Sequence, residues 1–314
     1  MTSTRLPERF ASRLRIPVIS APMLRVSGPE LVTAACSAGV IGAFPTANAR
    51  TAAELDDWLS MIERDVTDWS APYAANLIIR SPRFESDLEV LVKHRTEVVI
   101  TSVGSPAPAV GALHDVGTTV FADVATIRHA RAAVSDGVDG LVLLTGGAGG
   151  QTGWLNPFAF VRAVRSFYDG PLVLAGGITD GTSLAAALTL GCDVGYLGTT
   201  FIATQESRAE DDYKRMLVDS GMDDVVLTRA FTGLPANMLA PSIRDAGLDP
   251  AELDETVTPA EAAELYGSKG SGPARWSRVW SAGHSVSGVG EVTSTAALVE
   301  RLATEYEQAR AHRR

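Results

Sequence analysis

The sequence is poor in cysteine. Cys36 and Cys192 are the only two among 314 residues. The chain therefore has neither a CxxC motif for metal or redox chemistry nor enough thiols for a disulfide framework. This composition is typical of a cytoplasmic protein, and we expect that location and no bound metal.

Positive charge and long apolar runs are also scarce. Lys and Arg number 27 against 37 Asp and Glu, which gives a formal net charge of −10 and a pI near 5.0. Such an acidic chain has no long-range attraction to nucleic acid or anionic lipid. No apolar run approaches the roughly 18 residues needed to cross a bilayer. We expect neither nucleic acid nor a membrane as a partner, and a small molecule instead.

Short apolar runs rich in Val, Ile and Leu alternate along the chain with Ala-rich segments of helical periodicity. This alternation is typical of βα units around a parallel sheet. The runs are apolar almost throughout, as strands buried on both faces are. They cover residues 17–23, 41–46, 73–79, 98–104, 119–125, 140–146, 172–178 and 194–201.

Eight consecutive βα units predict an α/β fold, the closed (β/α)8 or TIM barrel. A doubly wound open sheet is the alternative architecture. That fold usually has fewer parallel strands, and it carries a GxGxxG phosphate loop after the first strand. Here the first run ends in Pro22-Met23-Leu24 without such a loop, so the barrel is favoured.

The barrel pattern pauses after residue 203. Residues 204–274 are more polar, with helical patterns at 205–217 and 258–266. We therefore predict a barrel formed by residues 1–203 and 275–314, with residues 204–274 as a helical insertion that forms a lid over the barrel mouth. The amphipathic pattern at 293–310 predicts the helix that completes the outer ring.

Capping residues predict where two of the helices begin and end. Asn156 precedes Pro157, and a good N-cap before proline at the first helical position marks a helix start. Gly170 closes that pattern. Asp180 and Gly191 bracket the next helix, because glycine supplies the left-handed conformation that ends a helix.

The stretch 141–156, LVLLTGGAGGQTGWLN, is a strand that runs into a glycine cluster. Gly146, Gly147, Gly149 and Gly150 let the backbone approach a flat or anionic ligand closely and adopt φ values that other residues avoid. A tight structural turn is the alternative, because glycine also punctuates ordinary loops. Gln151, a neutral amide, follows directly.

Two further loops are suited to a phosphate group. In a (β/α)8 barrel, phosphates are commonly held by the loops after strands seven and eight. Gly176 and Gly177 end the seventh run, and Gly198 and Thr199 interrupt the eighth. These loops offer backbone N–H groups and a hydroxyl, so a phosphate would be bound there without Lys or Arg. The alternative is that the glycines merely relieve crowding at strand ends.

In their order and spacing, these motifs resemble the nitronate monooxygenase family, formerly called 2-nitropropane dioxygenases. The resemblance covers nearly the whole chain. It implies a TIM barrel that binds flavin mononucleotide (FMN), and a small electron-donating substrate such as a nitronate that is oxidised with O2. It is carried by PVISAPM, NLII, TGGAGGQTG, LAGGITDG, GCDVGYLGTTF, AFTGLPAN and WSAGHSVSGV.

The resemblance also implies roles for single residues. Pro22 and Met23 would line the face of the flavin ring, and Asn76 would contact the ring, although Asn76 can equally be a strand-end turn residue. The glycines of the two glycine-rich loops would approach the ribityl phosphate arm, and residues at the end of the eighth run would complete the phosphate cradle. These residues are Gly149, Gly150, Gly176, Gly177, Tyr196, Leu197, Gly198 and Thr199.

The sequence departs from the family at its catalytic position. The glycine pair is typically followed by a catalytic histidine, and here that position is Gln151. Glutamine orients a substrate by hydrogen bonds but cannot take a proton at neutral pH. Because a nitronate is already deprotonated, we expect selectivity for the anionic form. His284 is the candidate for a replacement base, with an ordinary surface histidine as the alternative. Asp123 ends the fifth run and can either face the ligand or cap the next helix.

Other functions remain open on the sequence alone. One alternative is an NAD(P)H-dependent flavin reductase of the enoyl-thioester or quinone reductase type. A second is a flavin-binding protein in which Gln151 has impaired catalysis. A third is a flavin-free barrel acting on phosphorylated sugars. The oligomeric state is also open, with a homodimer as one option, since Trp276 and Trp280 suit either a core or a self-association surface.

Overall fold

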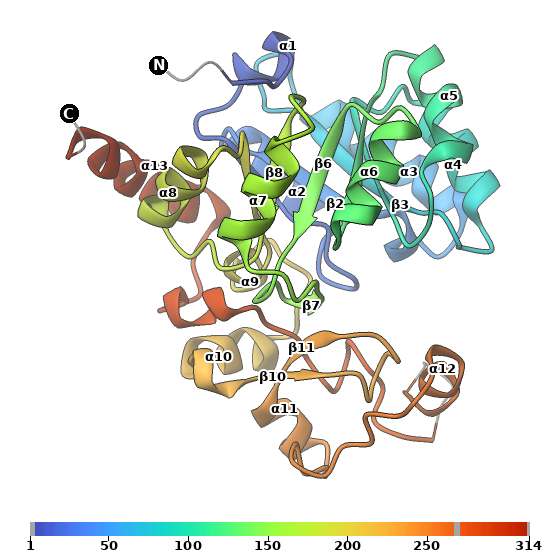
Figure 1. The fold of residues 1–314 in the computed structure, drawn as a ribbon, viewed down its shortest axis with the longest axis vertical. Coiled ribbons are helices and arrows are strands. Elements are labelled where there is room, and N and C mark those ends of the chain that lie inside the picture. Colours follow the sequence, from blue (N-terminus) through green and yellow to red (C-terminus); the bar gives the residue numbers. More distant parts are fainter. Residues whose placement is uncertain (1–3, 267–270, 313–314) are drawn as a thin grey trace.

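The computed structural model describes residues 4–266 and 271–312. Eight parallel strands close into a barrel in the order of the chain, as Figure 1 shows in the upper part of the molecule. Each of the eight apolar runs contains one of these strands, so the predicted barrel is confirmed. The strands are β1 (Val18–Ser20), β2 (Ile41–Pro45), β3 (Tyr73–Ile78), β4 (Val98–Ser102), β5 (Thr119–Val124), β6 (Gly140–Leu144), β8 (Leu172–Ala175) and β9 (Val194–Leu197).

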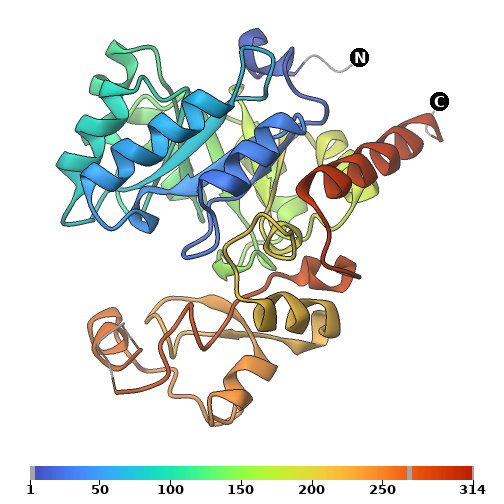
Figure 2. The same cartoon turned by 180° about the vertical axis from the view of Figure 1, so that it is seen from behind.

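Helices alternate with the strands and surround them. The last helix packs against both α8 and α2 and so closes the ring, which can be followed from behind in Figure 2. Asn156 caps α7, Asp180 caps α8 and Gly191 ends α8 with a φ of 121°, as predicted. The ring consists of α2 (Pro29–Ser37), α3 (Ala52–Asp65), α4 (Phe84–Lys93), α5 (Ala107–Asp115), α6 (Ile127–Ser135), α7 (Pro157–Arg165), α8 (Gly181–Leu190) and α13 (Thr295–Ala311).

Two predicted boundaries were wrong. The eighth run was expected to remain a strand to residue 201, but β9 ends at Leu197 and a short helix, α9 (Thr199–Ile202), begins directly. Helix α7 was expected to continue to Gly170 and instead ends at Arg165. The first error arises because an apolar run does not by itself distinguish a buried strand from a buried helix. The second arises because Gly170, which was expected to end the helix, lies in the loop between α7 and β8 and does not have a positive φ.

The core has two layers, separated by the barrel wall. Side chains that point inward, among them Phe121 and Val173, fill the barrel, while those that point outward pack under the ring of helices. Leu6 and Phe10, from the segment around α1 (Glu8–Ala11), join the inner layer and close the amino-terminal end of the barrel. A ligand can therefore enter only from the carboxyl ends of the strands.

The segment between β9 and α13 lies below the carboxyl ends of the strands in Figure 1. We call residues 204–274 the cap and residues 275–288 the return segment. The cap contains the expected helices and, in addition, an antiparallel hairpin that pairs with the two-residue strand β7 (Gly150–Gln151) of the barrel. Its elements are α10 (Asp211–Asp219), η2 (Met222–Asp224), β10 (Val225–Thr228), β11 (Ala236–Leu239), α11 (Ala240–Asp245) and α12 (Pro259–Tyr266).

The return segment packs with the cap before the chain rejoins the barrel. Val279 belongs to the same apolar cluster as Phe231 and Met238, and the ring of Trp280 stacks on Tyr213 with a centroid distance of 5.0 Å. The short helix η3 (His284–Gly288) follows. Two residues singled out in the sequence, Trp276 and Trp280, thus lie where the cap faces the barrel.

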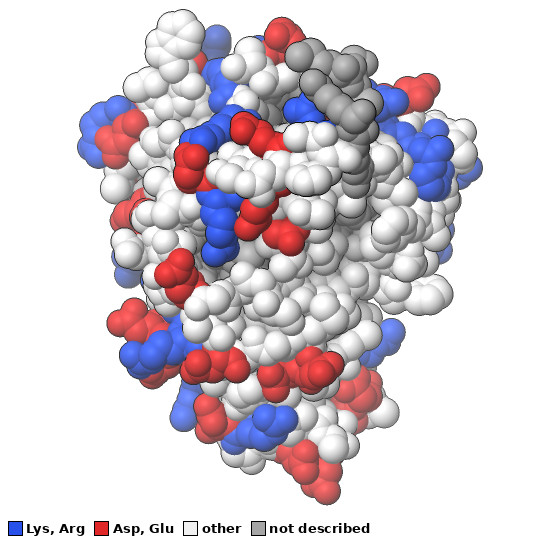
Figure 3. Space-filling view, turned by 90° about the vertical axis from the view of Figure 1, so that its left-hand side faces the viewer, with Lys and Arg blue, Asp and Glu red and all other residues white. Residues whose placement is uncertain are grey.

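Acidic and basic side chains are interspersed on the face of the molecule shown in Figure 3. The acidic excess of the chain is thus not gathered into a single uniform field on this face. No helix in the described parts of the chain is long and apolar enough to cross a membrane.

Candidate active site

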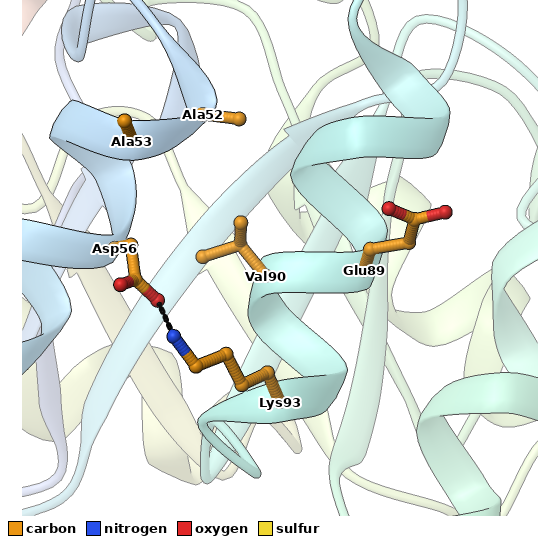
Figure 4. A pocket seen from close by; sticks show the side chains of 6 residues that line it. All are labelled: Ala52, Ala53, Asp56, Glu89, Val90 and Lys93. Atoms are coloured by element: carbon orange, nitrogen blue, oxygen red, sulfur yellow. Dashed lines mark hydrogen bonds and ion pairs between the residues drawn. The ribbon is translucent and has the colours of Figure 1, made fainter.

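A cavity of about 1120 Å³ lies at the carboxyl ends of the barrel strands. Loops that follow the strands form one side of it, and the cap and the return segment contribute Tyr213, Leu234 and Trp280 to the other. A second depression, of about 320 Å³, lies between α3 and α4, where Lys93 pairs with Asp56 at 2.6 Å (Figure 4). This depression lies between two helices of the outer ring, whereas active sites of this fold lie at the carboxyl ends of the strands, so the large cavity is the candidate site.

The structure brings together most of the residues singled out in the sequence. Two of them do not line the cavity. Leu197 points into the outer core, and the imidazole of His284 lies against Gly147 of the glycine loop, which we define as residues 146–150. Those that line it are Pro22, Met23, Asn76, Gly149, Gly150, Gln151, Gly176, Gly177, Tyr196, Gly198 and Thr199.

Asn76 lies on β3 with its side chain held in place by the neighbouring strand. Its Nδ2 donates to the carbonyl of Ile100 at 3.0 Å, and its Oδ1 accepts from the hydroxyl of Ser102 at 3.2 Å. Asn76 is buried yet lines the cavity. One N–H and one lone pair of the amide remain for a ligand.

The glycine loop needs its glycines for close backbone contact and for left-handed φ. Gly147 and Gly150 have φ values of 91° and 66°. A Cβ on Gly149 would lie 2.8 Å from the backbone nitrogen of Gly283. The return segment therefore packs directly on this loop, which larger residues would push apart.

Gln151 lies at the edge of the cap hairpin. In the β7–β11 ladder it pairs with Ala236, and Gly150 pairs with Asn237. The side chain of Gln151 is exposed and lines the cavity. Pairing fixes the backbone of Gln151, so its amide is presented at a defined place on the cavity wall.

Asn237 is a functional candidate that sequence reasoning did not assign a role. It is 3% exposed, and its Nδ2 donates to the carbonyl of Ala148 at 2.7 Å. The bond joins the cap to the middle of the glycine loop. The motif AFTGLPAN, which ends in this residue, was the available signal, but nothing in it indicated which loop the amide would reach.

The loops after β8 and β9 form a cradle of small residues. Gly176 and Gly177 have φ values of 117° and 75°. A Cβ at Gly177 would meet no atom within 4 Å, so the absent side chain leaves room in the cavity. Gly198 precedes α9, whose first turn starts at Thr199 and receives no side-chain cap. The first N–H groups of a helix have no partner within it and attract anions.

His284 is placed to support the glycine loop. Its backbone N–H donates to the carbonyl of Gly147 at 2.9 Å, and a Cβ on Gly147 would lie 2.8 Å from its Nδ1. The imidazole therefore lies against Gly147, and His284 does not line the cavity.

Asp123 does not cap the helix that follows β5. That cap is Thr126, whose hydroxyl accepts from the backbone N–H of His129 at 3.1 Å. Asp123 instead lines the cavity together with Tyr196. Burial raises the pKa of the Asp123 carboxyl to about 7.

The two cysteines have no part in the site. Both are buried, and burial raises the pKa of each thiol to about 12, so neither is a nucleophile at neutral pH. Within residues 4–266 and 271–312, no group of three or more His, Cys, Asp or Glu is placed to hold a metal ion.

The residues of the cavity fit a flavin. Apolar side chains at Pro22 and Met23 provide a surface for a ring, and the cradle at Gly177 leaves space for a phosphate without a bulky side chain. The carboxyl Oδ1 of Asp123 and the hydroxyl of Tyr196 are buried without a partner among the described residues. Buried polar groups are nearly always hydrogen-bonded, so these two atoms indicate a bound ligand that supplies their hydrogen-bond partners.

These features define a (β/α)8-barrel protein with a covered, cofactor-sized cavity at the end of the barrel where enzymes of this fold place their active sites. The model of the nitronate monooxygenase family matches residues 78–305. The chain therefore belongs to the nitronate monooxygenase family, whose members are flavin-dependent oxidoreductases.

Individual relatives differ in their reactions. The chain is 28% identical over 288 residues to nitronate monooxygenase from Paraburkholderia phytofirmans, with 77% of this chain and 78% of that protein covered. It is 29% identical over 223 residues to (3aS,4S,5R,7aS)-5-hydroxy-7a-methyl-1-oxo-octahydro-1H-indene-4-carboxyl-CoA dehydrogenase from Rhodococcus jostii. That match covers 71% of this chain and 62% of the relative's length.

Among solved structures, FabK from Thermotoga maritima superposes with a TM-score of 0.84 at 25% identity. The superposition covers 99% of this chain and 98% of FabK. The similarity therefore includes the cap as well as the barrel.

Proposed function

We propose that the protein is an FMN-dependent oxidoreductase that oxidises alkyl nitronates with O2. The observation that supports this most directly is the glycine cradle at the ends of β8 and β9, which opens into a cavity large enough for FMN. Bound FMN would supply the two-electron oxidant, which O2 regenerates. In this proposal, Gly176, Gly177, Gly198 and Thr199 hold the phosphate.

The ring would lie on the apolar surface at the mouth of the barrel. Pro22 and Met23, which line the cavity, would contact its face, and the free N–H of Asn76 would be available to its polar edge. The cap, residues 204–274, acts as a lid. Tyr213 and Leu234 on the lid, with Trp280 from the return segment, exclude water from the reacting atoms.

Gln151 would select the substrate by its charge state. Its amide N–H donates to a nitronate oxygen, but the side chain has no basic group to remove a proton from a neutral nitroalkane. A missing base typically costs about 10²–10⁴-fold in rate. The substrate would therefore enter as the anion.

Visible spectroscopy of the purified protein with added FMN tests the proposal. Under anaerobic conditions we expect propionate 3-nitronate to bleach the bound flavin, and O2 to restore the colour. A protein that binds no FMN would contradict the cofactor assignment. Flavin that no donor reduces would instead favour a binding protein without catalysis.

The size of the cavity favours a second candidate, an NAD(P)H-dependent reductase acting on a thioester or quinone. Ligand cavities usually measure about 300–1,000 Å³, and this one reaches about 1120 Å³. Exposed apolar side chains at its rim, Leu24, Val103, Trp154 and Leu234, would suit a larger substrate. Rapid bleaching by NADH or NADPH, but not by the nitronate, would move the assignment to this reaction.

A further inference from the structure

Two polar groups lie unpaired inside the mouth of the barrel. Asp123 is two residues from Phe121 on β5, and Tyr196 is two residues from Val194 on β9. Residues two apart on a strand point to the same face. Because Phe121 and Val194 fill the barrel, both side chains point into it. The Oδ1 of Asp123 and the hydroxyl of Tyr196 have no hydrogen-bond partner in the described chain. Both residues line the cavity, so a ligand there can reach them.

No positive charge compensates Asp123. Burial alone raises the pKa of the Asp123 carboxyl. The pKa of the Tyr196 hydroxyl is raised by burial and, to a smaller extent, by the nearby Asp123 charge. On the neighbouring strands, Ser102 of β4 and Leu144 of β6 face the cavity and carry no charge. The other titratable residues of the cavity wall form no ion pair or hydrogen bond with Asp123; they are Arg80, His129, Asp136, Tyr213 and Arg275.

The barrel order places Asp123 away from the phosphate cradle. The cradle follows β8 and β9, and β5 is separated from β8 by β6. A flavin with its phosphate in the cradle would reach Asn76 and Asp123 on β3 and β5 if its ring crossed the mouth of the barrel. The pyrimidine edge of a flavin carries two carbonyl oxygens, which require hydrogen-bond donors.

We propose that Asp123 is a flavin-binding residue that acts as a neutral carboxylic acid and donates its proton in a hydrogen bond to a carbonyl oxygen of the flavin ring, beside the hydroxyl of Tyr196. This inference rests on the proposed function. An ionised carboxylate offers only acceptors and would repel the carbonyl edge. An apolar site that keeps a carboxyl group neutral makes it a donor.

The pH dependence of flavin binding to the apoprotein tests this assignment. Riboflavin is the main probe, because FMN has a phosphate that itself titrates near pH 6. If only the protonated carboxyl binds, a pKa of about 7 makes riboflavin bind about 30-fold more weakly at about pH 8.5 than at about pH 6. Quenching of flavin fluorescence measures the dissociation constants.

Asp123→Asn is the matched variant, because an amide has the shape of the acid and donates at every pH. We expect its riboflavin affinity to stay constant over this range. Tyr196→Phe removes the neighbouring donor and leaves Asp123, so affinity should fall about 2- to 10-fold with the pH dependence retained. With FMN in place of riboflavin, titration of the phosphate changes the affinity of all three proteins equally. The difference in pH dependence between wild type and Asp123→Asn then measures the contribution of the Asp123 carboxyl.

The wild-type apoprotein offers a readout that needs no variant. Infrared difference spectra between acidic and neutral pH should show the C=O band of a protonated carboxyl that titrates near pH 7. Flavin affinity that is independent of pH in the wild type, or that varies equally in Asp123→Asn, would overturn the assignment. A wild-type protein that binds no flavin at any pH would instead contradict the proposed function.

Discussion

The side-chain amide of Asn237 donates a hydrogen bond of 2.7 Å to the carbonyl of Ala148. Asn237 belongs to the cap hairpin, and Ala148 lies in the middle of the glycine loop. The neighbouring β7–β11 pairing places Gln151 on the cavity wall. The buried side-chain amide of Asn237 thus connects the cap to the glycine loop.

Asn237→Ala should destabilise both the fold and the site. Removing the donor leaves the buried Ala148 carbonyl unpaired, which costs about 1–3 kcal/mol in the free energy of unfolding. We also expect weaker FMN binding, because the glycine loop loses its anchor. Urea unfolding and FMN titration measure the two effects. A loss of stability with unchanged FMN affinity would show that the β7–β11 ladder positions the loop without this bond.

Gly177→Ala should impair FMN binding more than stability. Gly177 has a φ of 75°, and a Cβ there would project into the cradle. Gly117, with a φ of 84°, also has no atom within 4 Å of an added Cβ, but it does not line the cavity. Each alanine variant should lose about 1–2 kcal/mol of stability from the left-handed backbone. Equal FMN affinities in the two variants would argue against the cradle.

Gln151→His should introduce a base at the position where the family resemblance predicts a catalytic histidine. We expect kcat/KM for neutral nitroalkanes to rise, by up to about 10²–10⁴-fold, with little change for the corresponding nitronates. Steady-state kinetics with nitroethane and its nitronate provide the comparison. Gln151→Asn keeps an amide and should give no such rise. A gain of equal size on both substrates would refute the missing-base explanation.

His284→Ala distinguishes a support for the loop from a replacement base. Because the imidazole lies against Gly147 and His284 does not line the cavity, we expect weaker FMN binding and an unchanged pH profile of kcat. His284→Gln should behave in the same way with a smaller effect. Loss of an ionisation from the pH profile of kcat in both variants would instead assign His284 as the base.

Local sequence signals were sufficient for the barrel and for several helix ends. A strand buried on both faces is apolar along its whole length, so runs such as 98–104 could be identified without their partners. Asn156 and Asp180 cap α7 and α8 through bonds to residues only two or three positions away. The same signals failed at β9, where Thr199–Ile202 is as apolar as a strand but forms α9.

The sequence predicted those parts of the candidate site that depend on the backbone rather than on side chains. Glycine marks places of close backbone packing or left-handed φ: Gly149 packs against the backbone of Gly283, and Gly177 has a φ of 75°, and both line the cavity. Side-chain direction was harder to predict. Leu197 follows Tyr196 directly, yet the alternation of a strand points one into the outer core and the other into the barrel.

By itself, the sequence determined the strands of a parallel barrel and its glycine-rich loops, because each of these depends on residues close together in the chain. Only the tertiary structure decided the environment of those residues. Asn237 reaches Ala148 across 89 positions, and the Oδ1 of Asp123 is buried on a strand that pairs with β4 and β6. Long-range hydrogen bonds and desolvation depend on atoms that folding brings together, so neither can be determined from neighbours in the sequence.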